Sequence, residues 1–548
     1  MIETPNSLSD RISQSRLITF LDVAWHLKGP AVIQNICRQI NKETGRSVLL
    51  LNFKHGGGDL DLSRLDFEKK GFEQRCQAFV PYLGIQRESP FIKLDIAVNE
   101  DDREILQISR FLKVCQTLFP YIIVKIDGRT YNRVVESFVS HSDFVYFLTT
   151  QKGVEQYHVN TALTEMDREV RKKIRILLLA EKGETISELK DLKVRFGKAI
   201  SRIIQLSPYG ISIPEGPDES FERKKRYMAQ FRYVAREIGA CRVGLVLSSG
   251  GAKGFAHIGV IQALEDNGIF VDYIVGSSVG SYMGACWASG YNGRQMQDLA
   301  KIYESPFGFM NLFTPSFSFR KGLIQGKRLE RRLTKILRAA RFKDLSIPLG
   351  VAATNLDTLE NKIFDRGDVA SAVRASCSIP GICVPTIRNH QTFIDGGITD
   401  PLPVRNMKSQ GIERIISVSL IPSRKQAKKN FHELEQKRKE RHMGVCQKIL
   451  RYVNRRVNYF AYGNAFFTII RSIEGAQIRQ VERDLRRSDI AIEPAACESH
   501  WLNFRNPSEH IEVGRKATEK KMKDIKKLVS PSLESCLISN PISTPTLN

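Results

Sequence analysis

Short apolar runs rich in β-branched residues alternate with helical patterns from the start of the chain. Between the first two runs, apolar residues from Ala31 to Ile40 recur at the spacing of an amphipathic helix. Parallel strands need such crossover helices, so this order predicts an α/β domain around a parallel sheet. The expected strands are Leu17–Ala24, Ser47–Phe53, Lys93–Val98, Tyr121–Ile126, Asp143–Thr149 and Lys173–Ala180.

A glycine cluster, Gly56–Gly58, follows the second expected strand. With this cluster, the order of elements resembles the deviant Walker ATPases related to chromosome-partitioning proteins. The G-x-x-x-x-G-K-[ST] loop that binds phosphate is missing, because the chain reads Trp25-His-Leu-Lys-Gly-Pro30 after the first strand. Lys28-Gly29 could be a decayed phosphate loop, but a turn into a helix with Pro30 at its first position is the simpler explanation. We therefore expect a degenerate, non-catalytic P-loop-like α/β domain at residues 15–235, after a tail at 1–14.

A Pro-, Gly- and Ser-rich stretch at residues 208–218 predicts a loop, and the basic stretch Ser220–Ile238 after it has a helical pattern. We place the domain boundary here. The second domain is expected at residues 241–530. The Ser-, Pro- and Thr-rich residues 531–548 are expected to form a disordered tail.

Two strand–turn–helix units follow Cys241. In the first unit, Val243–Leu247 predicts a strand, Ser248–Gly254 a glycine-bearing turn and Phe255–Asn267 a helix. Backbone amides of Gly250, Gly251 and Ala252 can converge before that helix and stabilise an oxyanion. A phosphate-binding turn of a nucleotide fold also favours glycines at a helix start, so the turn alone leaves both functions open.

In the second unit, the expected strand Val271–Val275 runs through Gly276-Ser277-Ser278-Val279-Gly280 into an apolar helix at 281–289. G-x-S-x-G between strand and helix places the serine on a strained turn, where close backbone approach requires the flanking glycines. The amide-rich helix start then points at the developing negative charge. This arrangement predicts Ser278 as a nucleophile.

A carboxylate is expected at the end of another strand, in Gln391-Thr-Phe-Ile-Asp395-Gly396-Gly397. A serine nucleophile needs a base within hydrogen-bond reach, and a partly apolar pocket would raise the basicity of Asp395. Taken alone, Asp-Gly-Gly more often forms a simple turn.

These motifs, in this order, resemble the patatin-like phospholipases, especially the branch of neuropathy target esterase and its bacterial relatives, over about residues 241–530. The resemblance implies a three-layer α/β/α hydrolase domain with a Ser-Asp dyad, in which Ser278 is the nucleophile and Asp395 the proton acceptor. It also implies an oxyanion hole in the glycine turn. The motif glycines are Gly254, Gly276, Gly280, Gly396 and Gly397, and Ala352–Leu356, Val373–Gly381 and Asp489–Pro494 fit as well.

The glycine turn departs from the family pattern G-G-G-x-[RK]-G, because Ser249 replaces its first glycine. The hole can still form if Ser249 avoids positive φ, although reduced activity remains an alternative. Lys253 matches the basic position and either orients the turn or contacts a phosphate headgroup. His257 and His390 suggest a Ser-His-Asp triad, but we expect neither to be catalytic.

The formal net charge of +24 attracts polyanions, and the chain has no helix-turn-helix, zinc-finger or RNA-binding signature that would favour nucleic acid. The basic segment 424–456 leads into an aromatic, apolar stretch at 457–470, a combination typical of contact with an anionic membrane. For residues 457–470, a solvated helix packed on its apolar side is the default reading. The aromatic segment 305–319 is expected to line an acyl channel or to fold onto the core.

Ten cysteines without metal-ligand spacing indicate reduced thiols, and no run is long enough for a transmembrane helix. We expect a cytoplasmic protein with peripheral membrane contact. The sequence thus predicts a serine lipid acyl hydrolase of phospholipase or lysophospholipase type that needs no metal or cofactor. The alternative is a catalytically weakened binding or regulatory protein at a membrane.

Overall fold

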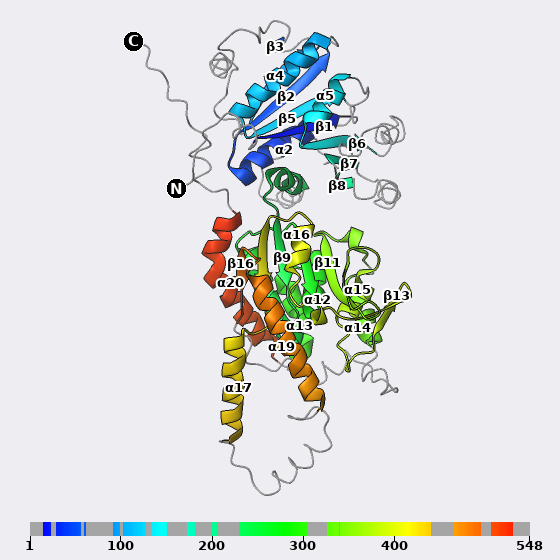
Figure 1. The fold of residues 1–548 in the computed structure, drawn as a ribbon, viewed down its shortest axis with the longest axis vertical. Coiled ribbons are helices and arrows are strands. Elements are labelled where there is room, and N and C mark those ends of the chain that lie inside the picture. Colours follow the sequence, from blue (N-terminus) through cyan, green and yellow to red (C-terminus); the bar gives the residue numbers. More distant parts are fainter. Residues whose placement is uncertain are drawn as a thin grey trace, which may run out of the picture. The chain divides into compact units, whose positions relative to one another are not determined.

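The computed structural model divides the chain into two compact units, the first ending at Cys241 and the second running from Arg242 to Val529 (Figure 1). The residues described are 15–22, 29–55, 60–61, 91–98, 102–127, 133–150, 173–180, 200–205, 230–304, 326–338, 340–439, 465–494 and 506–529. The expected tails, the turn at 25–28, the glycine cluster at 56–58 and the loop at 208–218 lie outside these residues, as do 305–319 and 440–464.

The first unit contains a sheet in which every pair of neighbouring strands is parallel. Its order is β3-β4-β2-β5-β1-β6-β7-β8. All strands expected for this unit are present, each within two residues of its predicted ends, which confirms the parallel α/β fold. The strands are β1 Arg16–Asp22, β2 Val48–His55, β3 Leu60–Asp61, β4 Ile92–Val98, β5 Tyr121–Asp127, β6 Phe144–Thr150, β7 Ile174–Ala180 and β8 Ile200–Gln205.

Alternating side chains of this sheet enter two separate cores. Leu17 and Leu21 pack with α4 (Asp102–Leu118) and α5 (Arg133–His141). Ile18 and Phe20 point the other way and pack with α2 (Gly29–Thr44) and with a helix at residues 230–239. Because successive side chains of a strand face opposite sides, the sheet is covered on both faces.

The second unit is built on a mixed sheet of order β13-β14-β11-β10-β9-β15-β16, with β12 also paired to β11. Strands β9, β10, β11, β15 and β16 are parallel, whereas β12 and β14 run antiparallel to β11. The strands are β9 Val243–Leu247, β10 Tyr273–Ser277, β11 Leu349–Asn355, β12 Asn361–Phe364, β13 Thr386–Arg388, β14 Gln391–Asp395, β15 Arg414–Val418 and β16 Ile490–Ile492.

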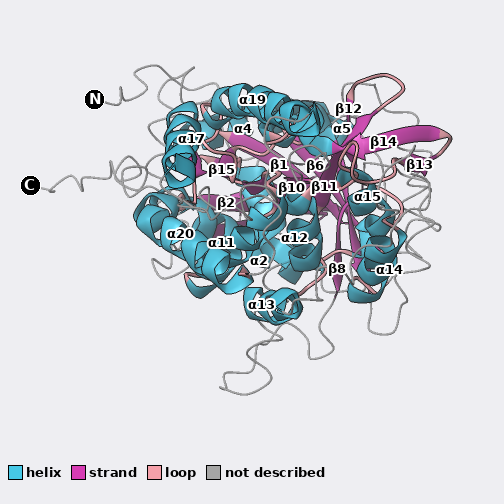
Figure 2. Ribbon diagram, turned by 90° about the horizontal axis from the view of Figure 1, so that it is seen from below, coloured by secondary structure: helices cyan, strands magenta, loops and turns pink. Residues whose placement is uncertain are grey.

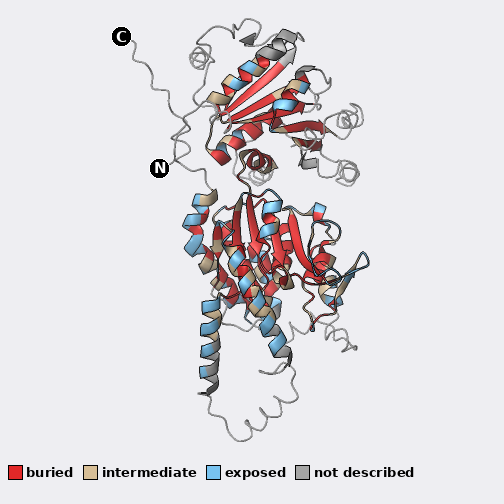
Figure 3. Ribbon diagram, viewed as in Figure 1, coloured by how far each residue is buried: buried red, intermediate tan, exposed pale blue. Residues whose placement is uncertain are grey.

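Helices cover both faces of the second sheet, so the unit has three layers, as expected. Leu245 and Leu247 of β9 contribute to a core with α11, α12 and α20, while Val246 faces a core with α16 and α19. Figure 2 shows α19 on one side of β10 and β15, and α11, α12 and α20 on the other. In Figure 3 the central strands are buried throughout. The helices are α11 Ala256–Asp266, α12 Val279–Ala288, α13 Gly293–Ala300, α14 Lys327–Ile336, α15 Val369–Ser376, α16 Val404–Ser409, α17 Arg424–Lys439, α19 Ala465–Leu485 and α20 Pro507–Val529.

Helices α11 and α20 cross at two glycines. A Cβ on Gly259 would collide with the carbonyl oxygen of Ile511, and a Cβ on Gly514 would collide with that of Ala256. The two backbones can approach this closely only because both positions lack a side chain. No helix in the described ranges is long and apolar enough to cross a bilayer.

Candidate active site

Ser278 lies on a strained elbow between β10 and α12. Its φ is 51° and its ψ is −123°, a conformation that non-glycine residues rarely adopt. A Cβ on Gly276 would lie 2.5 Å from backbone atoms of Gly280 and Ser281, and a Cβ on Gly280 would collide with the Leu247 carbonyl. The G-x-S-x-G pattern is therefore required by the tight passage of the chain. The strand ends two residues later and the helix begins two residues earlier than predicted, so the elbow is Ser278 alone.

Strand β14 brings Asp395 to the same point through its pairing with β11. Ala352 pairs with Ser277 and the adjacent Ala353 pairs with Asp395, so two strands end beside neighbouring residues of β11. The Ser278 hydroxyl donates a hydrogen bond to Asp395 Oδ2 over 2.6 Å. Residues 117 positions apart in the sequence thus form one hydrogen-bonded pair.

The Asp395 carboxyl group is buried, with 6% of the residue exposed. Its Oδ1 accepts the Gly397 N–H over 2.7 Å. Burial raises the pKa of Asp395 to about 6, while the hydrogen bonds from Ser278 and Gly397 act in the opposite direction. A carboxylate with this pKa is ionised at neutral pH and more basic than an exposed one, which suits proton transfer.

The C-terminal end of α15 holds both members of the pair. The Ser278 N–H donates to Ser376 Oγ over 2.8 Å, and that hydroxyl donates to the Ala352 carbonyl over 2.5 Å. Two residues on, the Ser378 carbonyl accepts the Asp395 N–H over 2.9 Å. In the sequence, this stretch was noted only as part of the family resemblance. No local pattern shows that Ser376 hydrogen-bonds to the Ser278 backbone.

The glycine turn packs directly against the Ser278 elbow. Residues Gly251–Phe255 form a short 3-10 helix, and a Cβ on Gly254 would collide with Val279, the residue after Ser278. Ser249 does not have a positive φ, but its N–H donates to the Pro401 carbonyl over 2.9 Å. Its amide is thus committed to the fold, which leaves Gly250, Gly251 and Ala252 as candidate oxyanion donors.

The lysine and the two histidines considered from the sequence are Lys253, His257 and His390. Lys253 lies within the 3-10 helix and is buried, with 7% exposed. The Nε2–H of His257 donates to the Ser248 carbonyl over 3.0 Å, and burial lowers the pKa of this fully buried ring to about 4. His390 is exposed at the turn between β13 and β14. The structure therefore brings neither histidine into a hydrogen bond with the Ser278–Asp395 pair.

Helix α19 contacts the loop that follows Asp395. Gln477 Nε2 donates to the Gly397 carbonyl over 2.8 Å, and Gln480 Nε2 donates to that of Thr399. Next along the loop, burial and the nearby Asp484 raise the pKa of Asp400 to about 7. No local sequence pattern marks these residues, because their partners lie some 80 positions away.

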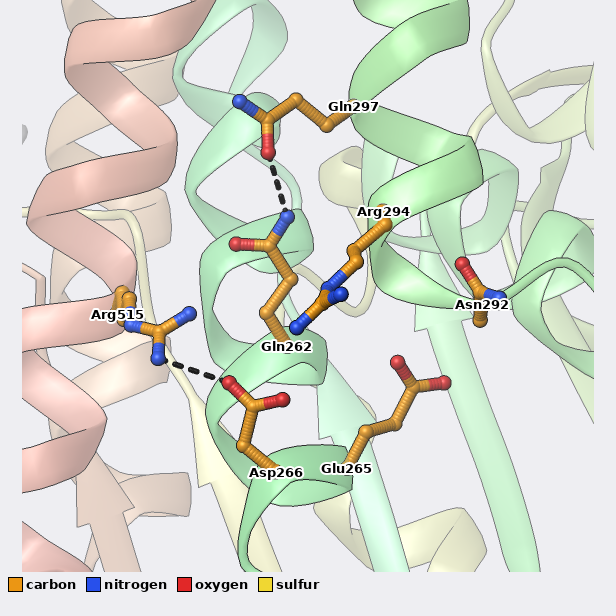
Figure 4. A pocket seen from close by; sticks show the side chains of 7 residues that line it. All are labelled: Gln262, Glu265, Asp266, Asn292, Arg294, Gln297 and Arg515. Carbon is orange, nitrogen blue, oxygen red and sulfur yellow. Dashed lines mark hydrogen bonds and ion pairs between the residues drawn. The ribbon is translucent and has the colours of Figure 1, made fainter.

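A polar hollow of about 490 Å³ lies at the far end of α11. Its lining in Figure 4 consists of Gln262, Glu265, Asp266, Asn292, Arg294, Gln297 and Arg515. Glu265 accepts hydrogen bonds from Trp287 Nε1 and the Gly293 N–H, and Asp266 pairs with Arg515, so its acidic groups serve the packing of helices. The glycine turn and Ser278 lie at the opposite end of α11, so this hollow is separate from the Ser278–Asp395 pair.

Comparison with known proteins identifies the domain that carries this geometry. Residues 245–408 match the family model described as patatin-like phospholipase. That range includes the glycine turn, the Ser278 elbow and Asp395. The second unit therefore contains a patatin-like phospholipase domain, as the motifs predicted.

The relatives of this domain carry related names. Lysophospholipase NTE1 of Candida albicans is 31% identical over 248 residues, which are 44% of this chain and 18% of that protein. An uncharacterized NTE family protein of Mycobacterium tuberculosis is 35% identical over 181 residues, 33% of this chain and 49% of that protein. The chain thus spans less than half the length of either relative.

Among solved structures, a ParA family ATPase from Chlorobium tepidum is similar to part of this chain. The match covers 40% of this chain and 98% of that structure. Its sequence identity is 15% and its TM-score 0.30. A likeness at this level carries no argument about what the first unit does.

Proposed function

We propose that the chain is a serine lipid acyl hydrolase that uses a Ser278–Asp395 dyad. The observation that carries this proposal is the 2.6 Å hydrogen bond from a strained elbow serine to a buried carboxylate of raised pKa. A nucleophile beside its base, with backbone amides next to both, is the arrangement that acyl transfer requires. The patatin-like match over the same residues supports this reading.

In the first half of the reaction, Asp395 takes the Ser278 proton while Oγ attacks the ester carbonyl carbon. The amides of Gly250–Ala252 stabilise the oxyanion of the tetrahedral intermediate. Collapse of the intermediate breaks the bond to the alcohol, which leaves with the proton from Asp395. In the second half, Asp395 accepts a proton from water, hydroxide attacks the acyl-enzyme, and the fatty acid leaves as Ser278 regains its proton.

The proposed substrates are phospholipids or lysophospholipids, because the family name and the names of the NTE relatives denote these classes. The proposed membrane contact includes helix α17, the described part of the basic segment 424–456. Its first turns expose basic side chains that would face anionic headgroups, and they include Lys425, Lys428 and Lys429. A cytoplasmic location with peripheral attachment is part of the same proposal, as is a headgroup contact for Lys253.

A non-catalytic membrane protein is the second candidate. The serine in place of the first motif glycine favours it, because the Ser249 amide is used by Pro401 instead of facing a substrate. Such a protein would have no need of a raised Asp395 pKa beside a strained serine.

Hydrolysis of a phospholipid and lysophospholipid panel by the purified chain tests the proposal. Ser278→Ala and Asp395→Asn should each lower turnover by about three orders of magnitude or more. Ser277→Ala is the matched control, since its buried hydroxyl finds no hydrogen-bond partner among the described residues and its loss should change turnover little. If the wild-type chain releases no fatty acid from any member of the panel, the non-catalytic candidate replaces the enzyme.

A further inference from the structure

Two hairpins of the second unit carry exposed apolar side chains at the edge of the sheet where Ser278 lies. We propose that the tips of these hairpins insert into an anionic lipid bilayer and so dock the active site on its substrate. The insertion face is defined by Leu356, Leu359 and Ile387. This inference rests on the proposed lipid hydrolase function, because it names the surface through which that enzyme reaches its substrate.

Strand directions place the insertion face on the Ser278 side. Strand β10 ends at Ser277, and the parallel strand β11 continues beyond it to Asn355 before the turn that contains Leu356 and Leu359. Strand β14 runs back toward Asp395 from the hairpin tip at Asn389 and His390. Both hairpins therefore extend outward from the sheet edge at which the dyad lies.

The two hairpins form one continuous surface. The Leu356 N–H donates to the Thr392 carbonyl over 2.8 Å, and Thr392 pairs with Ile387 across β13 and β14. Leu356 and Ile387 thus flank Thr392 from two sides. Residues directly opposite in antiparallel strands point to the same face, so Leu356 and Ile387 share one surface, and Leu359 lies in the turn three residues after Leu356.

The exposure of these side chains is large for their type. Leu356 is 42% exposed, Leu359 71% and Ile387 74%. By contrast, Phe393 on the neighbouring strand β14 is 1% exposed and packs against Phe364 at 4.9 Å between ring centroids. The hairpins therefore bury one apolar set in the fold and leave another in water, where insertion into a bilayer would remove it from water.

Charged side chains of both signs lie near the insertion face, because Asp357 and Glu360 are exposed in the same turn as Leu359 and basic side chains lie at the start of α14, near the base of the β13–β14 hairpin. Gly326, which precedes α14, packs against the Arg374 guanidinium, and Arg374 donates to the carbonyl of Val384 just before β13. The start of α14 beside this contact exposes Lys327, Arg328 and Arg331. Cations that border inserted apolar tips are the combination that interfacial proteins present to anionic bilayers.

The opposite edge of the sheet provides an internal comparison. Phe270 precedes β10, so it lies at the edge away from Ser278, and it is 36% exposed. A bilayer that contacts the dyad edge leaves Phe270 in water. The same substitution at the two edges therefore separates docking from a general loss of apolar surface.

The test uses a double variant that combines Leu359→Glu and Ile387→Glu. The single variant Phe270→Glu is its control. Binding is measured by co-sedimentation with phosphatidylcholine vesicles that contain phosphatidylserine. The double variant should bind about tenfold or more weakly, as expected for the loss of two buried aliphatic side chains, and Phe270→Glu should bind like wild type. The double variant should hydrolyse a water-soluble short-chain ester at the wild-type rate, while its hydrolysis of vesicle lipid falls. Equal vesicle binding by the double variant and wild type would overturn the proposal.

A gain of signal keeps the test decisive if the double variant does not fold. Leu359→Trp should shift its fluorescence to the blue and be quenched by bromine-labelled lipid when vesicles are added, whereas Phe270→Trp should not respond. The absence of any response from Leu359→Trp would refute insertion. If wild type releases no fatty acid from any lipid of the panel but Leu359→Trp inserts, the hydrolase proposal fails and the docking surface stands.

Discussion

The pH dependence of turnover follows from the burial of Asp395. Only the ionised carboxylate can take the Ser278 proton, and burial raises its pKa to about 6. Activity should therefore fall as the pH drops through 6. For a single ionisation, about one-eleventh of the enzyme is active at pH 5 and about ten-elevenths at pH 7, a roughly tenfold difference in kcat/KM.

The assay is kcat/KM for a water-soluble short-chain ester between pH 4.5 and 8, with circular dichroism at each pH to confirm folding. A soluble substrate removes the titration of lipid headgroups. Asp400, with a pKa of about 7 in the loop after Asp395, is another group that could produce this limb. Asp400→Asn is therefore the control and should keep an inflection near pH 6. An inflection near 4 in wild type, or its disappearance in Asp400→Asn, would refute the assignment to Asp395.

Three further predictions concern stability and positioning. Because the folded-state pKa of Asp395 is raised from 3.8 to about 6, its charge opposes folding above pH 6; Asp395→Asn should raise the free energy of unfolding by up to about 3 kcal/mol at pH 8, a gain that vanishes toward pH 4 in urea titrations. Ser376→Ala should lower kcat about ten- to a hundredfold with little change in KM, because the Ser278 amide loses its acceptor. A variant that is less stable but keeps the wild-type kcat would contradict this role. Gly259→Ala should lower the free energy of unfolding by about 1–3 kcal/mol, because the new Cβ collides with α20. Gly475→Ala on α19, where a Cβ meets nothing within 4 Å, should raise it by up to about 1 kcal/mol, and urea titration measures both changes.

Local patterns in the sequence were sufficient for most strands of the first unit, for β9, β10 and β14, and for the motifs that contain Ser278 and Asp395. The run Val243–Leu247 is a strand with the predicted ends, because an apolar run bounded by a glycine turn encodes its own limits. Ser278 and Asp395 were found because each lies in a short motif whose glycines are imposed by close backbone contact. Their separation of 2.6 Å depends on the register of β11, which no local pattern contains.

Features that depend on distant partners were missed. Ser376 resembles any other helix serine until its contacts with Ser278 and Ala352 are known. The same holds for Gln477, whose amide reaches the loop after Asp395 from another helix. Strand β8 escaped notice because Ile200–Gln205 alternates apolar and polar residues only partly, and its pairing with β7 includes an irregularity.

Labelling with a fluorophosphonate probe tests the central claim most directly, because only an activated serine attacks the phosphorus readily. The dyad predicts stoichiometric labelling of the wild-type chain, with mass spectrometry placing the adduct on Ser278. Ser278→Ala should remain unlabelled, Ser277→Ala should label like wild type, and Asp395→Asn should label far more slowly. A folded wild-type chain that stays unlabelled, or an adduct that persists in Ser278→Ala, would contradict the Ser278–Asp395 mechanism.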